Sequence, residues 1–304
     1  MSHHTRARYD AALHATLEKV RRDVHASDRL LRDPVQFVHR YVNPLDQELV
    51  ALVASAMAFG NVTSIVQKTE LLLGEVGSSP HRSASSLTKL QAQLKGFRHR
   101  VYVGDDLARL LVGARAVQAQ YRTIGDRFSS LMSEGSDLRR ALTTLCDEIR
   151  EAGGLPSDTL KVGDRRGPKH VLADPRGAGA NKRLMLFLRW MIRPRDGTDL
   201  GLWPIDPKAL VIPLDTHIHK VAMNLGFTTR TQVSWQTAVE VTDVLRLYDP
   251  ADPVKYDFSL CHMGMLQRCP SRRDARRCEG CGLINHCRHW KSHGRAKLPL
   301  LSDG

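Results

Sequence analysis

Apolar residues recur every three or four positions along most of the chain, which is the spacing of an α-helix. The spacing is found in segments 6–24, 46–59, 62–76, 105–121, 136–151, 232–247 and 253–266. Further helices are expected to begin near Asn181, before the apolar run KRLMLFLRWMIR, and at Asp215. Alternation with a period of two, which would indicate strands, is scarce. The pattern therefore predicts an all-α fold.

Two stretches rich in glycine and proline interrupt this helical pattern. Residues 152–180 are expected to form a loop between two helical units, and residues 194–213 a second irregular segment.

The charge balance is strongly basic. The formal net charge is +13 and the isoelectric point is about 9.8, which indicates a polyanionic partner. No apolar run approaches the ~18 to 20 residues that would span a bilayer, and the N-terminus lacks the apolar core of a secretory signal. We therefore expect a cytoplasmic, nucleoid-associated protein that binds DNA. The alternative is a basic surface without a specific partner.

Lys182 opens an apolar helix directly after the segment GAGAN, residues 177–181. Backbone N–H groups at such a helix start can hold a phosphate, so Gly177, Gly179 and Arg183 are candidate contacts to a DNA backbone. The helix dipole and partial burial would both favour a neutral amine at Lys182, the form that a nucleophile needs. The alternative is an ordinary lysine in the first helical turn.

Asp215 follows Pro213 and is well placed to cap the next helix. A carboxylate there stays ionised, so it could accept a proton or stabilise a developing sugar cation. One alternative is a simple cap. Another is a metal site formed with His217 and His219, although residues two apart on a helix do not share a face.

Four cysteines lie within nineteen residues of one another, in the pattern C-x8-C-x2-C-x5-C: Cys269, Cys278, Cys281 and Cys287. Four thiolates in a short loop can hold a zinc ion or an iron–sulfur cluster, and unligated cysteines are the remaining alternative. Four arginines in the first interval are expected to contact the DNA backbone: Arg272, Arg273, Arg276 and Arg277.

The segment PLDTHIHKVAMNLGF resembles the VDTHVFRVSNRLGL stretch of endonuclease III-like DNA glycosylases, in the helix-hairpin-helix superfamily. The resemblance extends unevenly over residues 35–290. It maps the catalytic aspartate of these enzymes onto Asp215 and their catalytic lysine onto Lys182. The thirty-three positions between the two resemble the long gap of archaeal 8-oxoguanine glycosylases. The hairpin signature LPGVGRKTA is kept only in outline, as DPRGAGANKRL.

The chain is still more similar to a family of uncharacterised helix-hairpin-helix proteins. Segments like FVHRY, KRLMLFLRWMIR, DLGLW, PLDTH and DPVKYDF recur there in this order. The cysteine pattern resembles the C-x6-C-x2-C-x5-C loop that holds a [4Fe–4S] cluster in endonuclease III-like enzymes. The resemblance therefore implies that cluster as the cofactor, with zinc as the alternative.

The resemblance also implies a two-subdomain glycosylase fold. Residues 1–44 and 215–304 would form one helical subdomain, which includes the cysteine loop 269–287. Residues 45–214 would form a barrel-like subdomain with a degenerate helix-hairpin-helix near 170–193.

The implied function is that of a monomeric DNA repair glycosylase, which removes a damaged base such as 8-oxoguanine from double-stranded DNA. A Schiff base on Lys182 would add AP-lyase activity. The alternatives are a monofunctional glycosylase and a non-catalytic DNA-binding protein. A flipped base needs a pocket with ring faces and polar groups, and the candidates are His39, Phe97, Trp190, Trp203 and Asp257.

Overall fold

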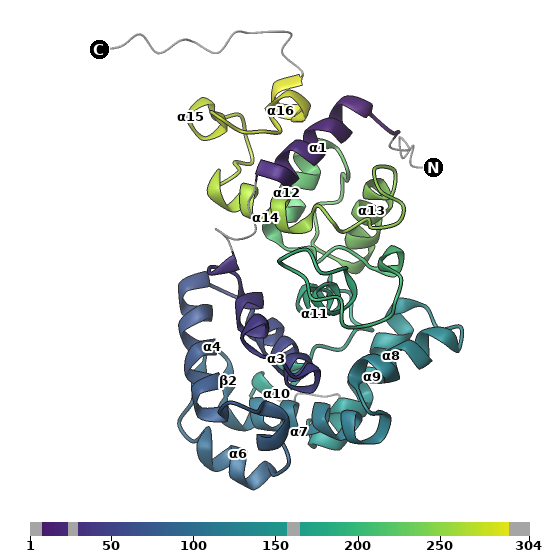
Figure 1. The fold of residues 1–304 in the computed structure, drawn as a ribbon. Coiled ribbons are helices and arrows are strands. Elements are labelled where there is room, and N and C mark those ends of the chain that lie inside the picture. The colour runs from purple at the N-terminus through teal and green to yellow at the C-terminus, as the bar shows by residue number, and fades with distance from the viewer. Residues whose placement is uncertain (1–7, 24–29, 157–164, 292–304) are drawn as a thin grey trace.

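The structure is a computed structural model that describes residues 8–23, 30–156 and 165–291 (Figure 1). Within these residues the only sheet is a two-stranded antiparallel hairpin, β1 (Arg98–His99) and β2 (Tyr102–Val103). The rest is mostly helical, so the predicted all-α class is confirmed. In chain order the helices are α1 (Ala11–Asp23), α3 (Pro44–Met57), α4 (Val62–Val76), α5 (Pro80–Ser83), α6 (Leu87–Gln93), α7 (Gly104–Tyr121), α8 (Ile124–Ser133), α9 (Leu138–Gly153), α10 (Gly167–Val171), α11 (Lys182–Ile192), α12 (Thr216–Leu225), α13 (Trp235–Leu245), α14 (Asp257–Leu266), α15 (Ala275–Cys278) and α16 (Arg288–Lys291), with 3-10 helices η1 (Pro34–Arg40), η2 (Pro207–Ala209) and η3 (Ile284–His286).

The helices that the sequence predicted are present in the described residues. Several begin where a side chain accepts a hydrogen bond from the first turn, as Asn61 does for α4 and Asp137 for α9. Helix α8 was not predicted, although Ile124, Phe128 and Leu131 are buried at helical spacing. The expected loop 152–180 contains the short helix α10, which has too few turns for a periodic signal.

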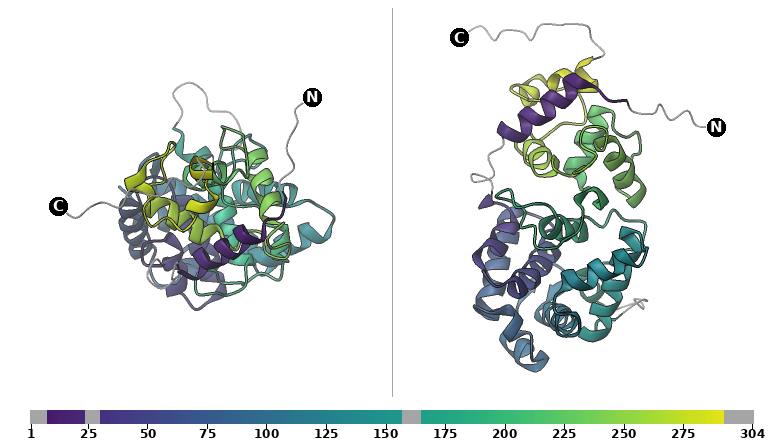
Figure 2. Two further views of the ribbon diagram at one scale, coloured as in Figure 1. Left: turned by 90° about the horizontal axis from the view of Figure 1, so that it is seen from above. Right: turned by 45° about the vertical axis from the view of Figure 1, so that its right-hand side comes forward.

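The helices form two groups with α11 between them (Figures 1 and 2). Helices α1 and α12 to α16 lie at one end of an elongated molecule, and α4 to α9 lie at the other. The 3-10 helix η1 packs against α3 and α4, so residues 34–40 lie with the second group. The predicted boundary at residue 44 had placed them with the terminal helices. No described helix combines the length and apolar character needed to cross a membrane.

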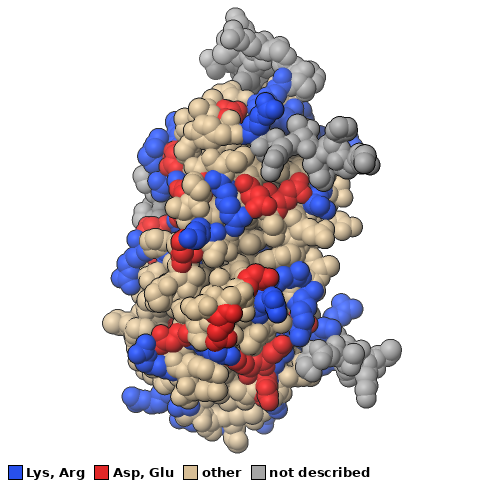
Figure 3. All heavy atoms as spheres, turned by 90° about the vertical axis from the view of Figure 1, so that its right-hand side faces the viewer, with Lys and Arg blue, Asp and Glu red and all other residues tan. Residues whose placement is uncertain are grey.

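Charged side chains of both signs share the surface. On the face drawn in Figure 3, acidic groups are interspersed among the basic ones and break them into small patches. The net positive charge of the chain is therefore not gathered into one continuous area on this face.

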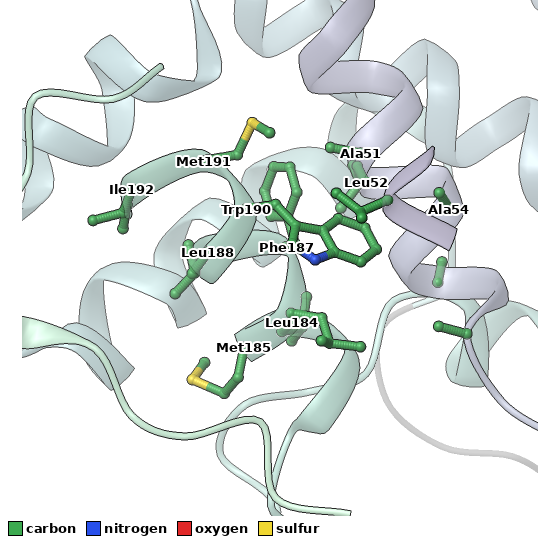
Figure 4. Close-up of a cluster of buried hydrophobic side chains, with 14 of the residues drawn as sticks. Ala51, Leu52, Ala54, Leu184, Met185, Phe187, Leu188, Trp190, Met191 and Ile192 are labelled. Atoms are coloured by element: carbon green, nitrogen blue, oxygen red, sulfur yellow. The ribbon is translucent and has the colours of Figure 1, made fainter. Parts of the chain in front are cut away.

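The core is centred on two helices that are buried on nearly all sides. Residues 46–57 of α3 and 184–192 of α11 are all buried, and the two helices pack against each other. A helix that is apolar all round belongs in the interior. Figure 4 shows Phe187 and Trp190 of α11 beside Ala51 and Leu52 of α3. This packing fixes the position of the first turn of α11, which begins with Lys182.

Candidate active site and cysteine centre

A cleft of about 630 Å³ lies between the two groups of helices. Its walls are the end of α3 with the turn to α4, residues 170–173, the first turns of α11 and α12, and one side of α14. Lys182 and Asp215 both line this cleft.

The side chains of Lys182 and Asp215 contact each other. Nζ of the lysine lies 3.4 Å from Oδ2 of the aspartate, and the two side chains are 33% and 15% exposed. The other oxygen, Oδ1, accepts hydrogen bonds from the backbone N–H groups of His217 (2.8 Å) and Ile218 (2.9 Å). The predicted cap on α12 is thus confirmed. It fixes the carboxylate so that Oδ2 faces a lysine that solvent can still reach.

Backbone geometry at the start of α11 positions the lysine. Asn181 has φ 52°, in the left-handed region, so the chain turns sharply just before Lys182. Arg139 of α9 holds this turn in place, because its guanidinium donates to the carbonyl oxygens of Pro175 (2.7 Å) and Gly177 (2.6 Å). Sequence reasoning had not identified Arg139, because its 36-residue separation from the turn leaves no local pattern.

The two glycines of this turn are exposed, in agreement with a surface contact. Gly179 also forms an isolated bridge with Ser234, which ties the turn to the start of α13.

Arg183, which the sequence suggested as a phosphate contact, is partly buried and lines the cleft. Its guanidinium donates to the carbonyl oxygens of Ala56 (2.9 Å) and His170 (2.6 Å) and to the hydroxyl of Tyr102. It therefore joins α3, α10 and the hairpin at the wall of the cleft. Burial, together with the nearby positive charges of Arg183 and Arg100, lowers the pKa of His170 to about 4. His170 is a neutral part of the cleft wall at physiological pH.

Among the expected base-pocket residues, Asp257 is the one that lines the cleft. Its carboxylate pairs with the guanidinium of Arg189. Burial raises the pKa of Asp257 to about 6, even though Arg189 favours the ionised form. Arg189 also donates to Asp199 at 3.1 Å, so a buried ionic network supports this part of the cleft.

The other four expected pocket residues lie elsewhere. Trp190 is completely buried in the core, and the indole N–H of Trp203 donates to Glu48 at 2.7 Å. His39 contacts the carbonyl oxygen of Thr198 at 2.8 Å, and Phe97 packs against the core beside the hairpin. Trp190 and Trp203 are core residues, Phe97 packs against the core and His39 is exposed, so none of the four lines the cleft.

The aromatic side chains that do line the cleft are Phe59 and Phe258, with the imidazoles of His170, His217 and His262. The spacing of Phe258 and His262, four residues apart on α14, was a signal that sequence reasoning missed. Phe59 follows the end of α3, where periodicity ends, and gave no such signal.

The four clustered cysteines line one small apolar cavity of about 30 Å³, beside α12 and α14. None of them forms a disulfide. Asn224 donates a hydrogen bond from Nδ2 to Sγ of Cys269 at 3.3 Å. Within the described ranges, no three or more histidine, cysteine, aspartate or glutamate side chains are drawn together as a metal-ion site. His219 instead contacts the carbonyl oxygen of Arg230 at 2.8 Å, so the structure does not support a site with Asp215 and His217.

The four arginines of the first cysteine interval are exposed. Arg273 stacks on the ring of Trp290, with 4.1 Å between its Cζ and the ring centroid. Nε of Arg277 lies 3.5 Å from Oδ2 of Asp274, and Arg277 also lines the cysteine cavity. Among the described residues, neither a ring contact nor an ion pair of this kind is made by the other two arginines, Arg272 and Arg276.

The fold and the cleft define a mostly helical protein in which a lysine–aspartate pair lies between two groups of helices. The chain belongs to the family described as "Protein of unknown function (DUF2400)", whose model matches residues 33–266. The match includes Lys182 and Asp215 and ends before Cys269. No curated protein and no solved structure matches the chain.

Proposed function

We propose that the protein is a helix-hairpin-helix DNA glycosylase that removes a damaged base from double-stranded DNA. The contact between Lys182 Nζ and Asp215 Oδ2, inside a cleft large enough for a nucleotide, is the observation that carries this proposal. Two further features support it. Helix α10, the exposed turn and α11 follow one another as helix, hairpin and helix. The helices on either side of the cleft form the two groups that a two-subdomain enzyme needs.

The pair can perform the reaction as follows. Asp215 Oδ2 takes a proton from the Lys182 ammonium, and the freed amine attacks the anomeric carbon of the damaged nucleotide. The glycosidic bond breaks, and the base leaves with the bonding electrons and takes up a proton. As the proton passes from Asp215 to the departing base, the restored carboxylate stabilises the positive charge that develops on the sugar. The lysine adduct then opens to a Schiff base, and β-elimination breaks the 3′ C–O bond.

A damaged base must leave the duplex stack to reach this pair. Phe59 and Phe258 line the cleft and would contact the extruded base, and Asp257 would supply a polar group at its edge. An oxidised purine such as 8-oxoguanine is the proposed lesion.

Four cysteines are the ligand set that a [4Fe–4S] cluster takes, and this chemistry supports a cluster as the cofactor. The four free cysteines line one apolar cavity, and an amide N–H of Asn224 donates to Sγ of Cys269. Cys269, Cys278, Cys281 and Cys287 would hold a [4Fe–4S] cluster, with zinc as the alternative. The cluster would supply a one-electron redox centre and a fixed scaffold for the loop that carries Arg272 and Arg276.

The proposal is tested on a panel of oligonucleotides, each with one lesion, by base release and by borohydride trapping of the Schiff base. The wild type is expected to be trapped on at least one lesion. Lys182→Ala should abolish trapping, and Asp215→Asn should reduce base release by at least ~100-fold. Lys220→Ala is the matched control, since it removes a lysine on α12 that does not line the cleft.

Other outcomes separate the alternatives. Base release without trapping would indicate a monofunctional enzyme in which water attacks the sugar. Salt-sensitive DNA binding with no release from any lesion would indicate a non-catalytic DNA-binding protein and contradict the proposal.

A further inference from the structure

Two ring nitrogens at the cysteine cavity lack a hydrogen-bond partner. His289 and Trp290 of α16 both line this cavity. His289 Nε2 and Trp290 Nε1 are buried and have no partner within the described residues. An indole nitrogen can only donate, so Trp290 needs an acceptor. A buried donor without one is unfavourable, so it calls for a physical explanation such as a bound water, an ion or a redox group.

Sulfur is the acceptor atom that recurs around this cavity, because all four cysteines line it. Apart from His289 and Trp290, the other lining side chains are mostly apolar, and the polar ones are Asn224, Gln267 and Arg277. The bond from Asn224 to Sγ of Cys269 shows that a nitrogen donor reaches one of these sulfurs. Two more donors on the same cavity are what a cluster with several sulfur atoms would need.

A neighbouring arginine packs on the ring of Trp290. Arg273 comes from the interval between Cys269 and Cys278, and its guanidinium stacks on the Trp290 ring at 4.1 Å. On the preceding 3-10 helix, His286 Nε2 lies 3.0 Å from Oγ1 of Thr16 on α1. The stacking restrains the indole ring, and the His286 contact anchors η3, which directly precedes α16.

We infer that Trp290, assisted by His289, donates N–H···S hydrogen bonds to the cluster held by the four cysteines. These bonds raise the reduction potential of the cluster and retain its iron. The inference rests on the cofactor proposed above. An added electron makes the cluster and its thiolates more negative, and the positive end of an N–H dipole stabilises that state. Removing the dipole therefore makes the reduction potential more negative.

The test uses full-length protein with its iron–sulfur content restored anaerobically. Trp290→Phe keeps an aromatic ring for Arg273 and removes the N–H. We expect a more negative reduction potential by electrochemical titration, and iron loss to a chelator that is about 10-fold faster. Trp235→Phe is the matched control, because Arg139 stacks on Trp235 at 5.0 Å on α13, outside the cysteine cavity. Its potential and iron loss should equal those of the wild type.

The sign of the change separates a hydrogen bond from simple packing. If the smaller ring only opened the cavity, water would reach the cluster and stabilise the more negative state, so the potential would become more positive. An unchanged or more positive potential in Trp290→Phe overturns the inference while leaving the cluster in place.

A second measurement uses the unmodified protein, in case Trp290→Phe does not fold. Electron–nuclear double resonance of the reduced cluster should show coupled protons that disappear after exchange into D₂O. Absence of such protons contradicts the inference. Purified protein that holds stoichiometric zinc and no iron would overturn both this inference and the cluster proposal, whereas base release is measured separately.

Discussion

The two oxygens of Asp215 have different partners, so its structural and chemical contributions can be separated by substitution. Oδ1 caps α12 and Oδ2 faces Lys182. Asp215→Asn keeps a cap acceptor but loses the negative charge, so its free energy of unfolding should stay within about 0.5 kcal/mol of the wild type. Asp215→Ala loses the cap as well and should be about 1 kcal/mol less stable. Denaturant titration measures both, and equal stability of the two variants would contradict this assignment.

Asp257 gives the stability of the protein a characteristic pH dependence. Its pKa is raised from 3.8 to about 6 by burial, so the folded state binds its proton more tightly than the unfolded state. Stability from this group is therefore present below about pH 4 and is lost as the pH rises to about 6. This shift in the pKa of Asp257 corresponds to at most about 3 kcal/mol in the free energy of unfolding.

The comparison with Asp257→Asn isolates this effect. Between pH 4 and pH 6, the free energy of unfolding of the wild type should fall relative to that of Asp257→Asn. A constant difference across that range would show that Asp257 does not titrate there.

At the scale of the elements, Glu48 of α3 connects parts of the molecule that are far apart in sequence. Oε1 accepts from Gly125 N (2.8 Å) and Trp203 Nε1 (2.7 Å), and Oε2 accepts from Gln118 Nε2 (2.9 Å) and Ile124 N (2.9 Å). The carboxylate thus holds the start of α8, the end of α7 and the segment after α11 against the central helix.

Glu48→Gln should be strongly destabilising for this reason. Whichever way the new side-chain amide is oriented, its NH₂ group replaces an oxygen that accepted two hydrogen bonds. Both of those donors then lose their acceptor. We expect a loss of at least about 2 kcal/mol in denaturant titration. Glu70→Gln is the control, since Glu70 is 56% exposed and pairs with Arg40 at the surface, and it should cost less than about 1 kcal/mol. Similar losses in the two variants would contradict a special position for Glu48.

At the scale of the whole molecule, the effect of the +13 charge on DNA binding depends on where the exposed cationic side chains lie. Arg272 and Arg276 are exposed on the cysteine loop, and the proposal places them on DNA phosphates. The double variant Arg272→Ala/Arg276→Ala should reduce the slope of log affinity against log salt by about 2, close to 0.9 for each lost contact. Fluorescence anisotropy over a salt series measures the slope.

Arg98→Ala/Arg122→Ala removes the same charge at the opposite end of the molecule and serves as the control. Both residues are exposed, on β1 and after α7. An equal reduction of the slope in the control would assign the effect to net charge alone.

The sequence by itself determined the features that depend on neighbouring residues. Helical periodicity follows from which face of a helix is buried, so the long helices were predicted, whereas α10 has too few turns to show it. The cap at Asp215 is also local, since the backbone N–H groups that donate to it lie two and three residues further along the chain. The cysteine spacing, likewise, is a property of nineteen consecutive residues.

Only the tertiary structure decided which distant residues meet. It placed Lys182 against Asp215 across a thirty-three-residue gap, and it joined separate segments through Arg183 at the wall of the cleft. It buried Trp190 and Trp203 in the core and left Phe59 and Phe258 on the cleft. The physical reason is that an aromatic or charged side chain has the same local pattern whether it fills the core or lines a site. Its position depends on how α3, α11 and α14 pack together.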